Sequence, residues 1–340
     1  MSETVAFSKN SVNVFFHILT KCNLTCTHCY INPGQHGNNT LSVDTVTAWL
    51  NLFVNKTRND NLILLGGEPT LHPDLDKIVI SARKMGYSSI TIDTNGYLFH
   101  DILNKIKPDD IDFLSFSLDG ATAETNDKIR GNGCYDQCVS GIQNAVERGF
   151  KTSLIFTVSN ENIHELHMMP ALLSHLGVNR FFIQVIGIRG KSGDKSGTPE
   201  NKKLQVDRNT WMSLIPMVAK QVADLGIIVT YPKVFLKSTE IFECAGLVAE
   251  NYFIFPNGRV YRCPLCEDFS LHSFEIRDNA LIEKEKINEQ DLFALNIPEG
   301  CVMNKLVQSG NLSYKDDGTP EYQIACCLLK EEVTPRTTAL

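Results

Sequence analysis

The sequence lacks long apolar runs, an excess of basic residues, internal repeats and low-complexity segments. No stretch of its 340 residues reaches the roughly 18 uninterrupted apolar residues of a membrane span. The first ten residues are polar and contain no apolar signal core. The formal net charge is −7, whereas a nucleic-acid-binding surface normally shows a basic excess. We therefore expect a cytoplasmic protein that binds neither a membrane nor a nucleic acid.

Cysteine is the residue type that stands out. In the cytoplasm thiols stay reduced, so clustered cysteines indicate metal ligands rather than disulfides. The first group, Cys22, Cys26 and Cys29, has the spacing CxxxCxxC and directly follows an apolar run. Three closely spaced thiolates can hold three corners of an iron–sulfur cube and leave one iron open, as catalytic metal sites do. Taken alone, this spacing also fits half of a zinc site.

A second signal is the segment GGEPT at 66–70, which follows the apolar run Leu62–Leu65. A glycine pair alone predicts only a turn. The two signals in this order resemble the radical S-adenosylmethionine (SAM) superfamily. The resemblance implies that Cys22, Cys26 and Cys29 hold a [4Fe–4S] cluster whose open iron binds the amino and carboxylate groups of SAM. An electron from the cluster would then cleave SAM to a 5′-deoxyadenosyl radical.

The resemblance implies roles for further residues. Gly66, Gly67 and Glu68 match the segment that recognises the methionine amino group, since a carboxylate is a natural acceptor for an ammonium. His28 would meet the adenine and shield the cluster without being a ligand. Less specific matches are Ser117 as a SAM contact, Asp119 facing the substrate, Arg130 pairing with a carboxylate of SAM or substrate, Ser159 at the ribose and Gln184 to Gly187 near the adenine. Outside the family context each of these is equally a strand-end turn or cap.

The first two-thirds of the chain alternates strand-like and helix-like segments, which predicts a parallel α/β sheet. The expected strands are Asn13–Leu19, Leu62–Leu65, Ser89–Asp93, Phe113–Leu118, Ser153–Ser159 and Arg180–Ile186. Helices are expected near 42–56, 73–85, 99–106, 136–149, 162–176 and 208–225. This alternation matches the partial (β/α)6 TIM-like barrel of the superfamily, in which functional groups gather at the carboxyl ends of the strands.

From about residue 240 the sequence becomes irregular and rich in cysteine. We therefore expect a barrel over 1–235 and a small cysteine-rich α+β domain over 236–340. Phe253–Arg262 predicts a β-hairpin with an Asn-Gly turn, which would bring Cys244 and Cys263 together. The spacing C-x13-G-x4-C resembles the opening of the SPASM and twitch extensions, which add auxiliary iron–sulfur clusters to radical SAM enzymes. The rest of the SPASM pattern, CxxC-x5-C-x3-C, is absent.

Six C-terminal cysteines suffice for one four-ligand cluster but not for two. We expect one auxiliary [4Fe–4S] cluster held by Cys244, Cys263, Cys301 and one of Cys326 and Cys327. Cys266 is the competing ligand, because it forms a CxxC with Cys263. A structural zinc knot is the alternative. Cys134 and Cys138, four residues apart, are expected to be buried as small hydrophobic residues.

One polar segment after the last expected barrel strand has two interpretations. Arg189–Lys203 is rich in Gly, Ser and Lys, and is either a solvated connector or a basic lid over an anionic substrate.

The resemblance implies a flavodoxin- or ferredoxin-like electron donor, hydrogen abstraction from the substrate and an oxidation assisted by the auxiliary cluster. Modification of a ribosomally made peptide is the expected reaction. Dehydrogenation or decarboxylation of a small molecule, such as a tetrapyrrole or cofactor precursor, is the alternative.

A non-catalytic iron–sulfur or zinc scaffold is the hypothesis from another class. Glu68 separates the two classes, because a scaffold has no use for an ammonium-binding carboxylate beside an open cluster. The molybdopterin-pathway cyclase has a similar length, but its C-terminal cysteine spacing and its glycine-rich tail are not found here.

Overall fold

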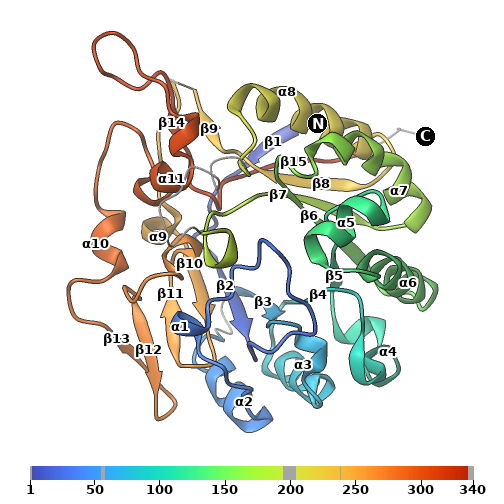
Figure 1. Ribbon diagram of the computed structural model, residues 1–340. Helices are drawn as coiled ribbons and strands as arrows, with labels where there is room; N and C mark the ends of the chain where they lie inside the picture. The colour runs from blue at the N-terminus through green and yellow to red at the C-terminus, as the bar shows by residue number, and fades with distance from the viewer. Residues whose placement is uncertain (1, 55–57, 194–203, 238, 336–340) are drawn as a thin grey trace.

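The computed structural model describes residues 2–54, 58–193, 204–237 and 239–335 (Figure 1). Most of the segment predicted as a connector or lid, residues 194–203, lies outside the described residues. In the part of the chain that the structure describes, every helix is too short or too polar to span a lipid bilayer.

The fold is built on one large, mostly parallel sheet that alternates with helices. The strands are β1 (Ser2–Val5), β2 (Ser11–His17), β3 (Asn59–Leu65), β4 (Ser89–Thr94), β5 (Phe113–Ser117), β6 (Thr152–Val158), β7 (Arg180–Val185), β8 (Ile228–Pro232), β9 (Phe235–Leu236), β10 (Glu250–Ile254), β11 (Arg259–Tyr261), β12 (Phe274–Arg277), β13 (Ala280–Glu283), β14 (Gln323–Ile324) and β15 (Lys330–Val333). The helices are α1 (Pro33–His36), α2 (Val43–Leu50), α3 (Leu75–Met85), α4 (Ile102–Lys105), α5 (Ala123–Arg130), α6 (Cys134–Glu147), α7 (Met169–Leu176), α8 (Arg208–Ala223), α9 (Ala245–Val248), α10 (Glu289–Phe293) and α11 (Val302–Val307).

The described strands of the main sheet lie in the order β1-β15-β8-β7-β6-β5-β4-β3-β2-β10-β11-β12-β13. Each neighbouring pair from β2 through β8 is parallel, and the helices that connect these strands cover the outer face of the sheet (Figure 1). The six expected strands correspond to β2 through β7. The predicted partial TIM-like barrel is therefore confirmed.

Strand β2 shows why these segments form a barrel wall. Val12, Val14 and Phe16 are buried in the main core, whereas Asn13 and Phe15 between them are partly exposed. Because side chains alternate between the two faces of a strand, the first set packs against the helices and the second set faces the barrel interior.

The sequence analysis did not predict helix α5, which is inserted between β5 and α6.

The residues after the barrel continue its sheet instead of standing apart from it. Strands β10 and β11 form the predicted hairpin, with Gly258 in the left-handed region at φ 85°. β10 also pairs in parallel with β2, placing Phe253 beside Phe15. At the opposite edge, β15 pairs with both β8 and β1. The C-terminal segment, orange to red in Figure 1, thus begins and ends against the barrel.

Candidate functional site

The CxxxCxxC loop leaves β2 at its carboxyl end. Cys22, Cys26 and Cys29 are unpaired, half-buried thiols. The Thr27 amide donates to the carbonyl of Ile129 (2.9 Å), and the Lys191 amide donates to the carbonyl of Cys29 (2.8 Å). The loop is thereby tied to α5 and to the segment after β7. Burial raises the pKa of Cys22 to about 11, so a bound metal centre would be needed to hold it as a thiolate at neutral pH.

The glycine segment packs directly against the start of this loop. The Gly67 amide donates to the carbonyl of Leu19 (3.0 Å), and the Glu68 amide donates to that of Lys21 (2.9 Å). A Cβ atom on Gly67 would lie 2.4 Å from the carbonyl oxygens of Thr20 and Lys21. Glycine is therefore required here by the close approach of the protein's own backbone, which positions Glu68 beside the cysteine loop.

The Glu68 carboxylate joins the ends of β3 and β4. It is 1% exposed, and its Oε1 accepts hydrogen bonds from Thr70 N (3.0 Å), Thr70 Oγ1 (2.6 Å) and Thr94 Oγ1 (2.8 Å). Its Oε2 accepts one from Asn95 N (2.7 Å). Burial raises the pKa of Glu68, while these hydrogen bonds oppose that rise. Since Oε2 accepts only this one hydrogen bond among the described residues, it keeps capacity for a further donor.

A buried charge cluster supports the other side of the loop. Asp119 lies just after β5 and is 0% exposed, which corrects the expectation that it faces the substrate. Its Oδ2 lies 2.6 Å from Arg130 Nη2 and 3.0 Å from His28 Nε2, and its Oδ1 accepts from Thr157 N (2.7 Å). Burial opposes ionisation, but Arg130 and His28 hold the pKa of Asp119 at about 2. In this structure the carboxylate partner of Arg130 is therefore the protein's own Asp119.

A cavity of about 210 Å³ opens beside this cluster, at the carboxyl ends of β6 and β7. It is lined by Thr27, His28, Ile129, Thr157, Ser159, Glu161, Ile186, Lys191, Ser192 and Leu204. The structure thus brings together His28, Ser159 and Ile186, three positions that the sequence analysis associates with the adenosine of SAM. Ser117 and Arg130 are not among the described residues that line it. His28 Nδ1 has no hydrogen-bond partner among the described residues.

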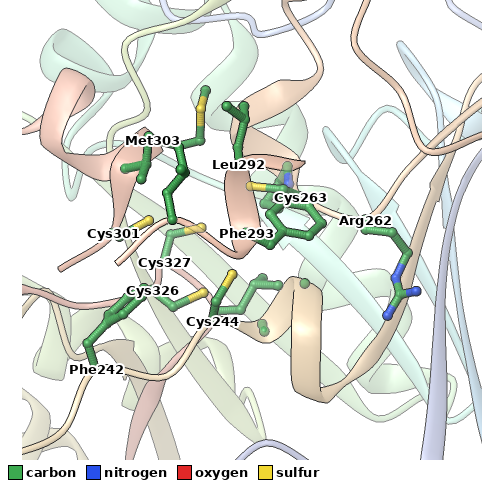
Figure 2. Close-up of a pocket in the computed structure, with 16 residues that line it drawn as sticks. Phe242, Cys244, Arg262, Cys263, Leu292, Phe293, Cys301, Met303, Cys326 and Cys327 are labelled. Carbon is green, nitrogen blue, oxygen red and sulfur yellow. The ribbon is translucent and has the colours of Figure 1, made fainter. Parts of the chain in front are cut away.

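The C-terminal cysteines surround a second pocket (Figure 2). The cysteines that line it are Cys244, Cys263, Cys301, Cys326 and Cys327. Apolar side chains, among them Phe242, Leu292, Phe293 and Met303, complete the lining. In Figure 2 the sulfur atoms lie around one common space, whereas the guanidinium of Arg262 points away from it.

Cys266 differs from the other C-terminal cysteines. It is 1% exposed and hydrogen-bonds the Cys263 thiol, yet it does not belong to the described lining of the pocket. Within the adjacent pair, a hydrogen bond from Cys327 lowers the pKa of the Cys326 thiol, which makes it the more readily ionised of the two. No three His, Cys, Asp or Glu side chains in the described ranges are close enough to bind a single metal ion. A set of thiols in apolar surroundings suits an iron–sulfur cluster by its chemistry.

Cys134 and Cys138 lie outside both cysteine groups. They are 2% and 1% exposed on the inner side of α6, which confirms their prediction as buried small residues.

A buried ion pair connects the cysteine loop to the C-terminal segment. Arg189 follows β7, pairs with Glu267 and donates to the carbonyl of Pro264. Its guanidinium carbon lies 4.5 Å from the centre of the Tyr30 ring, and the Tyr30 hydroxyl is 2.7 Å from His17 Nε2. The sequence analysis missed this connection, because its members belong to no common motif and lie far apart in the chain.

Stacked rings extend this connection. The Phe255 ring, just after β10, lies between the imidazoles of His17 and His36, with centroid distances of 4.2 and 3.9 Å. His36 ends α1, and its Nε2 is 3.0 Å from the carbonyl of Glu267. Burial lowers the pKa of His36 to about 4, so this ring is neutral at physiological pH.

Residues 17–173 match the radical SAM superfamily. A probable GTP 3′,8-cyclase of Saccharolobus solfataricus is 31% identical over 163 residues, which are 48% of this chain and 53% of that protein. The Fe-coproporphyrin III synthase of Methanosarcina barkeri is 32% identical over 195 residues, which are 56% of this chain and 48% of that protein. The chain thus spans about half the length of the curated relatives it matches.

Solved structures share the fold over a longer stretch. Streptococcus suis SuiB bound to its precursor peptide SuiA superposes with a TM-score of 0.63 at 15% identity, over 87% of this chain and 72% of SuiB. Native anSMEcpe with bound AdoMet and the Kp18Cys peptide gives a TM-score of 0.56 at 14% identity, over 84% of this chain and 80% of that one. Residues 17–173 therefore form a domain of the radical SAM superfamily, whose members use a [4Fe–4S] cluster and SAM, and the solved structures share the fold of the barrel.

Proposed function

We propose that this protein reductively cleaves SAM at a cluster held by Cys22, Cys26 and Cys29, and that it abstracts a hydrogen atom from a substrate bound in the barrel. When bound, the cluster and SAM would supply a 5′-deoxyadenosyl radical. The observation that carries the proposal is that the loop with three unpaired thiols begins in direct backbone contact with the Gly67-Glu68 segment, at the carboxyl end of a parallel barrel. Such an edge is where barrel enzymes place their reactive groups.

The neighbouring groups support a site for SAM. The free acceptor capacity of Glu68 Oε2 suits an ammonium group. The cavity lined by His28 and Ser159 suits a nucleoside. The ion pair of Asp119 and Arg130 fixes the imidazole of His28 and with it the loop that carries the thiols. We assign His28 a contact to the cofactor, and Asp119 and Arg130 a role as positioning residues.

The C-terminal pocket supports one auxiliary [4Fe–4S] cluster in a SPASM- or twitch-like extension. Cys244, Cys263 and Cys301 are three of its ligands, and one of Cys326 and Cys327 is the fourth. The position of Cys266 outside the lining favours a supporting role for this thiol. An auxiliary cluster would take up an electron and so make a net oxidation of the substrate possible. A flavodoxin- or ferredoxin-like protein would reduce the SAM-binding cluster.

A peptide is the substrate class that we favour. The similarity to peptide-bound SuiB covers 87% of this chain and therefore reaches into the C-terminal extension, whereas the curated relatives match only about half of the chain. A small molecule of the tetrapyrrole class is the second candidate, because the chain is 32% identical to the Fe-coproporphyrin III synthase over 195 residues. Stimulation of 5′-deoxyadenosine formation by candidate peptides or by porphyrins would distinguish the two.

Iron and sulfide analysis of anaerobically reconstituted variants tests the proposal. We expect about eight irons in the unchanged protein and about four in a Cys22/Cys26/Cys29→Ala variant. The Cys22/Cys26/Cys29→Ala variant should not cleave SAM when dithionite is the reductant. Cys134→Ala is the control, since this buried thiol belongs to neither group, and it should keep both iron and activity.

Two outcomes would contradict the proposal. SAM cleavage by the triple variant would exclude the CxxxCxxC loop as the site of the reaction. Zinc instead of iron in the triple variant would exclude the auxiliary cluster and leave a single-cluster enzyme with a structural zinc site.

A further inference from the structure

Lys330 occupies an unusual place between the barrel and the C-terminal cysteines. It begins β15, three residues after Cys327, and pairs with Pro232 at the carboxyl end of β8. Its Nζ donates to the carbonyl of Cys327 (3.1 Å) and lies 4.6 Å from the centre of the Phe182 ring. The ammonium is thus at the reactive end of the barrel and in contact with the cysteine-bearing segment.

The ring under this ammonium faces the barrel interior. Phe181 and Ile183, the neighbours of Phe182 on β7, are fully buried in the core beneath the helices. Because side chains alternate along a strand, Phe182 lies on the opposite, inner face. The Lys330 ammonium is therefore placed between the interior of the barrel and the pocket of the C-terminal cysteines.

The described part of the chain provides no carboxylate within ion-pair distance of this half-buried ammonium. Other partly buried cations of the protein do have such partners: Arg189 has Glu267, and Lys233 has Glu240 and Glu331. Holding an unpaired charge out of water is unfavourable unless something compensates it. The hydrogen bond to the Cys327 carbonyl instead places the ammonium beside the adjacent pair Cys326-Cys327.

We propose that Lys330 is the counter-charge of the auxiliary cluster and raises its reduction potential. The inference rests on the proposed auxiliary cluster. On reduction a cluster gains one negative charge, and a nearby fixed positive charge stabilises the reduced form more than the oxidised form. An auxiliary cluster tuned in this way takes an electron more readily from the side of the barrel, which is where the same ammonium contacts Phe182.

The test measures the reduction potential of the auxiliary cluster in a protein that lacks the SAM-binding cluster. The protein carries Cys22/Cys26/Cys29→Ala, so that iron is held only by the C-terminal cysteines. The midpoint potential of this cluster is measured by potentiometric titration followed by electron paramagnetic resonance. Lys330→Met removes the charge, Lys330→Gln removes the charge but keeps a donor for the Cys327 carbonyl, and Lys330→Arg keeps the charge. Lys305→Met is the matched control, because Lys305 is exposed and already paired with Glu299.

We expect a lower potential in both neutral variants, and an unchanged potential in Lys330→Arg and Lys305→Met. An auxiliary cluster of unchanged content and unchanged potential in Lys330→Gln would overturn the role of Lys330 and leave the proposed function standing. A lower potential in Lys330→Met but not in Lys330→Gln would assign the effect to the hydrogen bond with the Cys327 carbonyl and overturn the role of charge. The absence of any cluster in the triple-alanine protein with Lys330 intact would overturn the auxiliary cluster and the role of Lys330 together, and would leave a single-cluster enzyme.

Discussion

Arg130 and Asp119 form an ion pair inside the protein, with 2.6 Å between Nη2 and Oδ2, and Asp119 is wholly shielded from solvent. His28 shares the same carboxylate oxygen. The two side chains that contact this carboxylate come from the cysteine loop and from the end of α5, so one carboxylate fixes both segments. Its replacement would leave Arg130 without a counter-charge in the interior.

We expect Asp119→Asn to lower the free energy of unfolding by about 3 kcal/mol, because breaking a buried pair leaves one charge uncompensated. Denaturant titration of the apoprotein measures this loss. The double variant Asp119→Asn/Arg130→Met should recover part of it, since both charges are then removed. A loss that is larger in the double variant than in the single one would contradict this explanation.

The neutral state of His36 predicts a dependence of stability on pH. Its pKa is about 4 in the folded protein and about 6.5 in the unfolded chain, so below pH 6.5 the unfolded chain binds the proton first. The folded state is then penalised as the pH falls from about 6.5 to about 4, by up to about 3 kcal/mol. Unfolding measured at pH 7 and pH 4.5 tests this. His36→Gln, which does not titrate, should show a smaller loss between the two pH values.

Gly67 should not tolerate a side chain. A Cβ atom would meet two carbonyl oxygens at 2.4 Å, and both belong to backbone that cannot simply rotate away. We expect Gly67→Ala to cost about 2 kcal/mol of stability and to reduce the iron bound by the CxxxCxxC loop. Gly310→Ala is the matched control, because nothing lies within 4 Å of its added Cβ. Iron content and melting temperature that are equal in the two variants would show that the loop tolerates displacement.

Replacing Glu68 should separate catalysis from metal binding. Glu68→Ala removes the proposed acceptor for the SAM ammonium but none of the thiols, so iron content should stay intact. We expect SAM cleavage to fall by about 100-fold, which is the order of effect of removing one well-placed polar contact from an active site. The rate of 5′-deoxyadenosine formation, normalised to iron, gives the answer. Normal cleavage by this variant would show that the motif does not bind SAM in this protein.

The C-terminal cysteines should not contribute equally to iron binding. Cys301 lines the pocket, whereas Cys266 is buried and does not belong to the described lining. In the Cys22/Cys26/Cys29→Ala protein we expect Cys301→Ala to abolish iron binding and Cys266→Ala to retain most of it. Retention by Cys301→Ala together with loss by Cys266→Ala would reverse the assignment of ligands.

The sequence was informative where the pattern is local. Strands β2 through β7 are short apolar runs whose alternation is visible in a few residues, and the CxxxCxxC and Gly-Gly-Glu segments carry their own spacing. The hairpin of β10 and β11 was predicted because Asn257-Gly258 is itself a turn signal. Each of these features depends on residues that are close together in the chain.

The structure added what depends on distant residues. The sequence analysis expected Asp119 to face the substrate because it follows a predicted strand. It could not show that Arg130 and His28, which lie elsewhere in the chain, converge on this carboxylate. Helix α5 is mostly polar and gave no apolar period. The hairpin of β12 and β13 was missed, because its strands are short and largely exposed.

The pairing of β10 with β2 and of β15 with β8 has a consequence for how this protein can be divided. A chain cut near residue 235 would keep the cysteine loop but would expose unpaired backbone amides and carbonyls along both outermost barrel strands. Open strands of this kind readily join with other chains and aggregate. The C-terminal segment therefore covers both outer strands of the barrel, and we expect a shortened chain to self-associate even with all three thiols of the CxxxCxxC loop in place.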